Sequence, residues 1–404
     1  MGNTPNIRFK GFTDDWEQRK LGDDLVSIHT GTNLLGSITN TGMPLIKMGN
    51  IQRGYFDTLK VEFLAENEQP DKADIANYGD FFFNTRNTLE LVGKGATWMK
   101  NSGEYAFNSN IARFELRNLD TIFFNYLYNT DYMTKQIHAR AMGTTSVAAI
   151  YPRTLDSVEY SAPCMKEQQK IGAYFKQLDH LITLHQRKCD ETKKLKKFML
   201  QKMFPKKDAK KPEIRFAGFT DDWEQRKLGE VFQEYSEKNH PELPALTIIQ
   251  GGGTVLREES ERKLQYDKSS LAGYKMVRED DFIVHLRSFE GGLEKSNHNG
   301  LISPAYHTFH GDEVDSRFYY PYFRSYEFIK HKLVPHVYGI RDGRSIDIDG
   351  MKTIEIPWTS YEEQKKIGDY IESLDTLITL HQRKCDELKE FKKYMLQNMF
   401  PQKG

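Results

Sequence analysis

Two stretches of the chain carry apolar residues at alternating three- and four-residue steps, the spacing that places side chains on one face of an α-helix. They run from Glu167 to Phe204 and from Glu363 to Phe400. The second begins with a capping box, in which Ser360 precedes Glu363 by three residues, and each stretch is followed by a proline, which cannot continue a helix. At about 1.5 Å per residue each helix is roughly 55 Å long, more than a small domain needs for its own core. We therefore expect the two helices to pack on each other, the alternative being that each one closes its own domain.

The two helices are copies of one sequence. Residues Leu181–Glu191 return letter for letter as Leu377–Glu387. A second repeat, here called the frame, consists of Gly11–Gly22 and its copy Gly218–Gly229, together with Ile7-Arg8-Phe9 and its copy Ile214-Arg215-Phe216 just before them. We expect the frame to have a structural role, with the large apolar side chain of Trp16 as a packing anchor. The chain is therefore a duplication, in which each half consists of a frame, a variable block and a long helix.

The variable blocks share almost no identity, yet their hydrophobic patterns are alike. Each contains a buried-strand pattern that ends in an arginine, at Gly79–Arg86 in the first block and Asp280–Arg287 in the second. Each also has an aromatic-rich helical pattern, at Ile122–His138 and Phe318–His331, followed by a glycine-containing loop. Because strand and helix patterns mix without regular alternation, we expect an α+β fold. The chain then divides into an N-terminal frame (1–22), a first domain (23–162), a central helix with linker (163–229), a second domain (230–358) and a C-terminal helix (359–404).

Composition and charge limit the classes of function. The chain has 404 residues, a formal net charge of zero and three cysteines, which suits a protein of at least two domains without a disulfide framework. It has no apolar run near the eighteen or so residues of a membrane span, and residues 1–10 lack the apolar core of a secretory leader, so we expect a cytoplasmic protein without a membrane partner. The first block is mildly acidic, with 12 Lys and Arg against 16 Asp and Glu in residues 23–160. If the chain binds DNA, local loops or a basic partner must supply the attraction to phosphates.

Several motifs, each weak alone, occur in a specific order. They are the Trp-Glu-x-x-Lys-Leu-Gly frame at Trp16, the run Lys47–Gly54, the Gly-Asp run ending near Arg86, the Gly-Thr loop at Gly143, and Glu-Gln-x-x-Ile at Glu167. In this order the chain resembles the DNA specificity subunit of Type I restriction-modification enzymes, over nearly its whole length and in both halves. The second block departs from the pattern at Gln250–Gly253, where the Asn-Ile of the first block is missing.

The resemblance implies a fold, a function and partners. Each variable block would be a target recognition domain, and the two long helices would form an antiparallel coiled coil that spaces these domains. The subunit would bind double-stranded DNA at a two-part target and direct two methyltransferase (modification) subunits and restriction/translocase subunits to it, in bacterial host defence. Adenine methylation, and with it S-adenosylmethionine, ATP and Mg, would belong to the partner subunits, so that this chain holds no cofactor.

The candidate DNA-contacting residues lie in polar loops at strand ends, where arginine and asparagine can pair bidentately with guanine and adenine edges. Such loops are also common on any globular surface. In the first domain the candidates are Lys47, Asn50, Arg53, Asn84, Arg86, Asn87, Thr144 and Ser146, and in the second they are Arg287, Ser288, Glu290, Arg341, Arg344 and Ser345. The expected inter-helix packing residues are Leu178, Leu181, Ile182, His185, Cys189, Leu374, Leu377, Ile378, His381 and Cys385. The two histidines in this set are expected to serve the interface rather than acid-base catalysis.

Motifs of catalysis are absent from the sequence. It contains neither the Asn-Pro-Pro-Tyr/Phe nor the Phe-x-Gly-x-Gly motif of an adenine methyltransferase, no G-x-x-x-x-G-K-[ST] P-loop and no Cys/His cluster at metal spacing. We therefore expect a non-catalytic subunit of an enzyme complex. Two alternatives stay open: the specificity region of a single-chain restriction-methylation enzyme, and a duplicated coiled-coil scaffold without a role in DNA binding.

The duplication also predicts geometry, because two like halves most simply pack about a pseudo-twofold axis. Antiparallel helices crossing on that axis would bring His185 near His381, and Leu178 near Cys385 or Leu388. The ends of the chain would meet, with the frame at Trp16 beside the end of the second helix. Half-site centres would then lie about one DNA turn, roughly 34 to 36 Å, apart.

Overall fold

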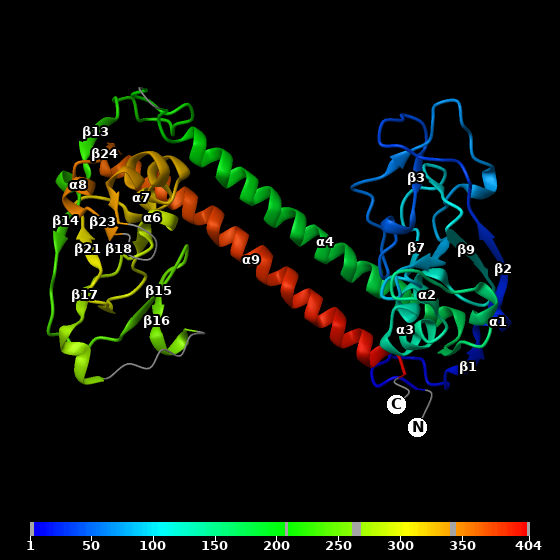
Figure 1. Ribbon diagram of the computed structural model, residues 1–404. Helices are drawn as coiled ribbons and strands as arrows, with labels where there is room; N and C mark the ends of the chain where they lie inside the picture. The colour runs from blue at the N-terminus through cyan, green and yellow to red at the C-terminus, as the bar shows by residue number, and fades with distance from the viewer. Residues whose placement is uncertain (1–3, 207–208, 261–267, 340–344, 402–404) are drawn as a thin grey trace. The chain divides into compact units, whose positions relative to one another are not determined.

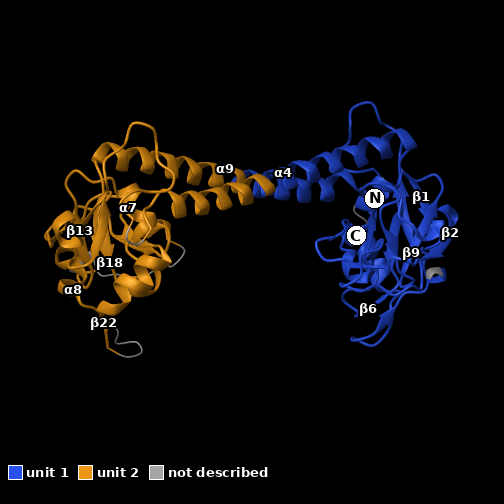
Figure 2. Ribbon diagram, turned by 90° about the horizontal axis from the view of Figure 1, so that it is seen from above, with its two compact units in different colours: residues 1–186, 383–404 blue, residues 187–382 orange. Residues whose placement is uncertain are grey.

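The computed structural model describes residues 4–206, 209–260, 268–339 and 345–401. The chain forms two compact units, coloured separately in Figure 2: residues 1–186 with 383–404, and residues 187–382. Each unit contains one frame, one variable block and one part of each long helix (Figure 1). Within the described ranges, no helix combines the length and the apolar character that crossing a membrane requires.

The first variable block, with its frame, folds into short strands and short helices. In chain order they are β1 (Glu17–Lys20), α1 (Leu21–Asp24), β2 (Leu25–Thr30), β3 (Pro44–Ile46), β4 (Glu62–Phe63), β5 (Phe81–Asn84), β6 (Arg86–Asn87), β7 (Gly95–Thr97), β8 (Ala106–Phe107), β9 (Ile111–Leu116), α2 (Thr121–Tyr128), α3 (Asp131–His138), β10 (Met142–Gly143), β11 (Ala148–Ala149) and β12 (Glu159–Ala162). The central sheet is antiparallel with the strand order β2-β9-β5-β7.

Strand β5 explains the uninterrupted apolar run in the sequence. Successive side chains of a strand point to opposite faces of the sheet. Phe81 and Phe83 belong to the core that includes α2, whereas Phe82 belongs to a second core with Trp98 and Phe107. Because both faces of this strand are covered, every one of its aromatic side chains is fully buried.

The second variable block and its frame repeat this plan. The elements are β13 (Glu224–Lys227), α5 (Leu228–Val231), β14 (Gln233–Tyr235), β15 (Leu246–Ile249), β16 (Gly253–Leu256), β17 (Lys275–Val277), β18 (Phe282–Val284), α6 (Ser288–Gly291), β19 (Glu294–Lys295), β20 (Gly300–Ile302), β21 (His307–His310), α7 (Ser316–Phe323), β22 (Val337–Tyr338), β23 (Ser345–Ile346), α8 (Ile348–Lys352) and β24 (Glu355–Trp358). The central sheet has the order β14-β21-β18-β19, which matches β2-β9-β5-β7 strand for strand. The expected α+β class is confirmed, and blocks of unrelated sequence share one sheet topology.

The aromatic-rich helices are shorter than the sequence pattern predicts. The pattern at Ile122–His138 is divided into α2 and α3, because the hydroxyl of Thr130 accepts a hydrogen bond from the Met133 amide and starts a new helix. In the second block, the pattern at Phe318–His331 covers α7 and then a π-helical segment, Glu327–Leu333. Apolar periodicity continues across both breaks and so does not reveal them.

The repeated frame fastens the start of each long helix. Strand β1 pairs with β12, and β13 pairs with β24, so that each frame lies beside the strand that leads into α4 (Met165–Lys202) or α9 (Tyr361–Met399). The guanidinium of Arg8 donates two hydrogen bonds to the buried Glu167, at 2.6 and 2.7 Å. Arg215 does the same to Glu363, at 2.7 and 2.8 Å.

The glutamine that follows each of these glutamates holds the domain helix. The side-chain oxygen of Gln168 accepts from the amide of Asp120, the N-cap residue of α2. Gln364 accepts in the same way from Asp315, the N-cap residue of α7. The repeated Glu-Gln pair is therefore a structural junction that ties frame, long helix and variable block together in each unit.

Within each unit the long helices run antiparallel, as expected. In the first unit Lys392 Nζ lies 2.5 Å from Asp179 Oδ1, and the Cys385 thiol faces the carbonyl of Ile182. In the second unit Lys196 Nζ lies 2.6 Å from Asp375 Oδ1, and the Cys189 thiol faces Ile378. In each unit, residue numbers on α9 decrease as the numbers of their contact partners on α4 increase, so the two helices are antiparallel there.

Burial separates the expected packing residues into groups. Leu178, Leu374 and both cysteines are buried, and Leu181, Ile182, His185, Ile378 and His381 are half-buried. Leu388 packs against the same core as Leu178, as expected. Leu377 is a correction: its side chain is 43% exposed, because the apolar stripe is wider than the line of contact between two helices. The approach of His185 to His381 stays a prediction.

The ends of the chain meet, also as expected. The amide of Ile7 donates to the carbonyl of Asn398 at 2.9 Å, and the Trp16 ring lies 6.0 Å from that of Phe400. In the second unit the equivalent hydrogen bond joins residues that are close in sequence. The amide of Ile214 donates to the carbonyl of Lys202 at 3.0 Å.

Candidate nucleic-acid interface

In the first unit, one small sheet gathers half of the predicted DNA contacts. Strand β11 pairs with β6 on one side and β10 on the other, so that Arg86 and Asn87 lie beside the loop that carries Thr144 and Ser146. The amide of Leu89 donates to the Thr145 carbonyl at 3.1 Å, which ties the two loops together. Arg86, Thr144 and Ser146 are exposed. These residues belong to two motifs that are far apart in the sequence. In the fold they lie together at one polar edge.

The run Lys47–Gly54 forms a turn in which Asn50 has a structural role. Its carboxamide oxygen accepts from the amide of Lys47, and its nitrogen donates to the carbonyls of Asp57 and Lys60. Only 9% of Asn50 is exposed. This corrects the expectation that Asn50 contacts a base, because its hydrogen-bonding groups are used to shape the turn. Lys47, half-exposed, forms an ion pair with Glu62 at 2.5 Å.

Arg53 lies at the exposed tip of the same turn, in a basic environment. Its guanidinium lies 3.0 Å from Nε2 of His138. Burial lowers the pKa of His138, and the positive charge of Arg53 lowers it further. Burial and the charge of Arg53 also lower the pKa of Lys94, whose ammonium contacts Gln52 at 2.8 Å. A neutral imidazole is therefore favoured at His138, where it can accept from Arg53.

Two further candidates are buried, and both are corrections. Asn84 is fully buried at the end of β5, and its side-chain oxygen accepts from the amide of Arg86. Ser288 is fully buried at the start of α6, where its hydroxyl accepts from the amide of His285 at 2.9 Å. Both side chains shape the loop that follows a central strand, and neither is accessible to DNA.

The remaining candidates of the second unit are divided between two loops. Arg287 and Glu290 are exposed around α6. Ser345 lies in β23, where it pairs with Tyr338 of β22. Arg341 and Arg344 lie outside the described residues. The β22–β23 and β10–β11 hairpins occupy the same place in the order of elements, after the aromatic helices and before the strand that enters the next long helix.

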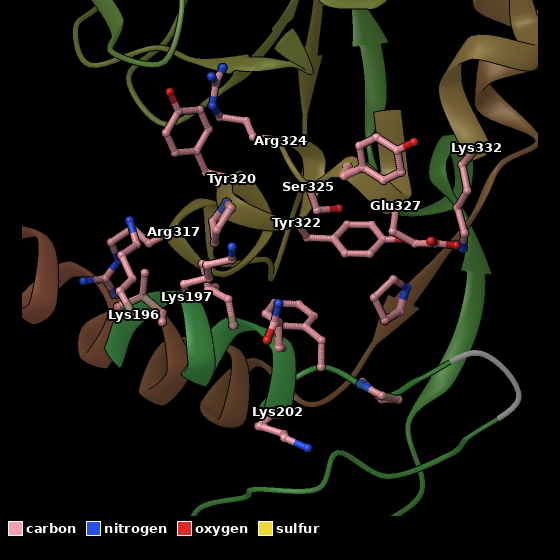
Figure 3. Close-up of a pocket in the computed structure, with 18 of the residues that line it drawn as sticks. Lys196, Lys197, Lys202, Arg317, Tyr320, Tyr322, Arg324, Ser325, Glu327 and Lys332 are labelled. Carbon is pink, nitrogen blue, oxygen red and sulfur yellow. The ribbon is translucent and has the colours of Figure 1, made fainter. Parts of the chain in front are cut away.

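A basic groove of about 2540 Å³ crosses the second unit, and the sequence did not predict it. Figure 3 shows Lys196, Lys197 and Lys202 of α4 together with Arg317 and Arg324 from α7 and the residue after it. Its lining contains ten basic residues: Lys193, Lys196, Lys197, Lys202, Lys206, Lys210, Lys295, Arg317, Arg324 and Lys332. It contains six acidic ones: Asp222, Glu224, Glu327, Glu355, Glu372 and Asp375. The excess of basic over acidic residues in this lining is suited to phosphates, and Tyr320, Tyr322 and Tyr326 add aromatic surface.

In the part of the chain that the structure describes, no cluster of His, Cys, Asp and Glu has the arrangement to hold a metal ion. Buried titratable groups there take part in hydrogen bonds within the fold. Tyr126, for example, has its pKa raised by burial and by the neighbouring Asp179, to which its hydroxyl donates at 2.8 Å.

Comparison with known proteins places this architecture in a family. Residues 13–194 match the model for the Type I restriction modification DNA specificity domain. Over 404 aligned residues the chain is 25% identical to the putative type I restriction enzyme MjaX specificity subunit of Methanocaldococcus jannaschii, covering 95% of this chain and 92% of the relative. It is 23% identical to the type I restriction enzyme MjaVIII specificity subunit of the same organism, over 95% of this chain and 91% of the relative.

A solved structure shows the same fold. The Type-I restriction-modification system S subunit from M. genitalium superimposes with a TM-score of 0.60 at 14% identity, covering 99% of this chain and 100% of that one. The family model, the curated relatives and the duplicated arrangement of frame, α+β block and long helix agree with each other. Residues 13–194 thus carry the Type I restriction modification DNA specificity domain, and over nearly its whole length the chain is similar to type I restriction enzyme specificity subunits.

Proposed function

We propose that this chain reads a bipartite DNA target, one half-site with each variable block, and brings to it the subunits that methylate and cut DNA. The observation that carries the proposal is that one scaffold is used twice with different exposed polar loops. The frame, the order of the central sheet and the Glu-Gln junction are the same in both units. The loops that follow the central strands, at Arg86 and Arg287, differ in sequence. A constant scaffold with changed polar loops is what reading two unrelated half-sites requires.

The polar loops and the basic groove would make different kinds of contact with DNA. The polar edge around Arg86 and the loop around Arg287 would contact base edges, where side-chain geometry can discriminate. The basic groove would contact phosphates, which fix the register of a protein on DNA without reading its sequence. Lys193 and Lys197, exposed on α4, are the groove residues best placed for this role.

The long helices offer a duplicated surface for the methyltransferase subunits. Leu195 and Phe198 of α4 are 43% and 48% exposed. Their copies on α9, Phe391 and Tyr394, are 45% and 54% exposed. Large apolar side chains that stay exposed at the same places in a repeat support a repeated interface. Two copies of one surface would bind two copies of one partner, and the restriction/translocase subunits would join the complex that forms.

The absence of catalytic motifs from the sequence supports a non-catalytic role for the chain itself. S-adenosylmethionine, ATP and Mg would be bound by the partner subunits, which would carry out adenine methylation and cleavage. A methyltransferase that co-purifies with the chain from cells supports this function over a scaffold without a DNA role.

Changing Arg86 to alanine is expected to weaken methylation at one half-site by roughly 5- to 150-fold, because a good bidentate pair with a base contributes about 1 to 3 kcal/mol of discrimination. The measurement is methylation of a randomised DNA library by the chain reconstituted with its methyltransferase subunits, read separately at each half-site. In the same assay, the chain alone is expected to transfer no methyl group and to cut no DNA.

Lys197→Ala in the basic groove is the matched control. It should weaken binding to specific and random DNA alike and reduce the salt dependence of binding by about one phosphate contact. If Arg86→Ala behaves like this control, Arg86 contacts the backbone instead of a base. Methyl transfer by the purified chain alone would contradict its non-catalytic role.

A further inference from the structure

The turn between β15 and β16 lies where the second block departs from the sequence pattern of the first. It consists of Gln250, Gly251 and Gly252, all exposed, and leads into the buried Gly253. Gly251 and Gly253 have φ values of 84° and 72°, a backbone conformation that glycine adopts without strain. The turn therefore has a defined shape that depends on its glycines.

A buried carboxylate holds this turn. Glu294 is fully buried, and its two oxygens accept from the amides of Gly251 and Gly253 at 2.8 and 3.1 Å. The same carboxylate accepts from the Tyr320 hydroxyl at 2.7 Å and forms an ion pair with Arg324. Burying a carboxylate is costly unless charge and hydrogen bonds compensate it. Here the compensating donors come from the turn itself and from the helix behind it, so the turn is fixed to α7.

The first unit holds its own turn from the same two helix positions. In α2, Asn125 donates to the carbonyl of Gly54 at 3.0 Å, and a side chain at Gly54 would contact both Asn125 and Asn129. These asparagines lie five and nine residues after the N-cap residue of α2. Tyr320 and Arg324 lie five and nine residues after the N-cap residue of α7. Asparagines in the first unit, and a tyrosine and an arginine in the second, thus support equivalent turns from equivalent helix positions.

This equivalence gives Gln250 a counterpart. Gly54 has a φ of 81°, close to that of Gly251, and the residue just before it is Arg53. Arg53 and Gln250 are both exposed at the tips of their turns. Gln250 therefore takes the place of Arg53, although the two turns share only the glycine that follows.

The side chain of Gln250 is also directed to the α6 loop. A methyl group added at Gly291 would collide with the amide nitrogen of Gln250. Its carboxamide therefore lies over Gly291, next to Glu290 and in the loop that begins at Arg287. The absence of a side chain at position 291 leaves room for it.

We propose that Gln250 reads an adenine in the second half-site, and that Glu294 is the positioning residue that holds it there. The inference rests on the proposed function, since it requires the second block to read DNA. A glutamine carboxamide can donate to N7 and accept from N6 of adenine, the bidentate pair that specifies this base. Glu294 never touches DNA; it fixes the backbone that presents Gln250.

The test uses the full chain reconstituted with its methyltransferase subunits and a library of DNA targets. Gln250→Ala should relax one adenine position of one half-site, with a loss of discrimination of roughly 5- to 150-fold. Gln250→Arg should shift the preference at that position towards guanine, the base that arginine pairs with bidentately. Gly291→Ala, which displaces the carboxamide without changing it, should relax the same position.

Glu294→Gln distinguishes positioning from folding, because it keeps the shape of the side chain and removes its charge. It should relax the same adenine position as Gln250→Ala while the other half-site keeps its sequence. A Glu294→Gln chain with a lower melting temperature but unchanged base preference would overturn the positioning role.

The two levels of the proposal fail in different ways. If the wild-type complex methylates both half-sites and Gln250→Ala leaves every position unchanged, Gln250 does not read a base. If the wild-type complex shows no sequence preference in either half-site, the proposed function itself is wrong.

Discussion

Replacing Glu363 with alanine is expected to lower the free energy of unfolding of the second unit by about 3 to 5 kcal/mol, the usual cost of removing one partner from a buried ion pair. Glu363 is 1% exposed and accepts two hydrogen bonds from Arg215. It also accepts from Nε1 of Trp223 at 3.1 Å. Without the carboxylate, the guanidinium of Arg215 keeps only its hydrogen bond to the carbonyl of Asp221, and the buried indole N–H of Trp223 loses its acceptor.

Calorimetry of the wild-type and variant chains measures this effect, with the transitions of the two units resolved because a chain of two compact units need not unfold in one step. Glu362→Ala is the matched control, since the neighbouring glutamate is exposed on the same helix. The control should change stability by less than about 0.5 kcal/mol. A Glu363→Ala chain as stable as the control would show that the junction does not hold the frame.

Changing Leu195 and Phe198 to aspartate is expected to release one of the two methyltransferase subunits from the complex. Burying a large apolar side chain contributes about 1.5 to 3 kcal/mol, and an aspartate in its place adds the cost of an unpaired charge. Phe391 and Tyr394 carry the second copy of this surface on α9 and stay unchanged. Native mass spectrometry of the reconstituted complex should therefore find one methyltransferase in place of two.

Because the surface is duplicated, the same change can be made in its second copy. Changing Phe391 and Tyr394 to aspartate should release the other copy, and changing both pairs should release both. Each single-pair complex should methylate less at one half-site than at the other. A complex that keeps two methyltransferases in all three variants would place the docking surface elsewhere on the chain.

The parts of the fold that the sequence predicts well are those with a repeat or a strong period. The long helices begin and end within two residues of the predicted bounds, because the 3.6-residue stripe and the flanking proline mark them. The frame was expected to be structural, and the ion pairs of Arg8 and Arg215 give the reason. Among the expected packing residues, Leu377 is exposed. Periodicity identifies the apolar face of a helix but not the line along which two helices come closest.

The candidate site was harder to predict because the type of a residue does not reveal whether its side chain points outwards or into the fold. Asn50, Asn84 and Ser288 were chosen as polar residues in loops, yet their side chains point inwards and hydrogen-bond to the backbone. The same residue types shape turns and read bases, and only the fold separates the two uses. The longer side chains of Arg53, Arg86 and Arg287 are all exposed, as a base contact requires, and their contact with DNA stays a prediction.

Two features arise only from the fold. The basic groove combines lysines of a repeated helix with arginines of a variable block, so neither stretch alone indicates it. Residues 193–197 hold four lysines around Leu195, but a cluster of lysines on a helix is commonly just a solvated face. Gln250 was not among the candidates because its turn shares only a glycine with the turn of the first block, while the helix positions behind both turns are equivalent.

The central claim is that each variable block reads one half-site on a common scaffold. The most direct test replaces residues 230–358 with a second copy of residues 23–162, reconstitutes the chain with its methyltransferase subunits and maps the methylated sequences. The account predicts that the asymmetric target becomes two inverted copies of the first half-site, with the second half-site lost. A target that keeps the original second half-site after its block has been removed would contradict the account.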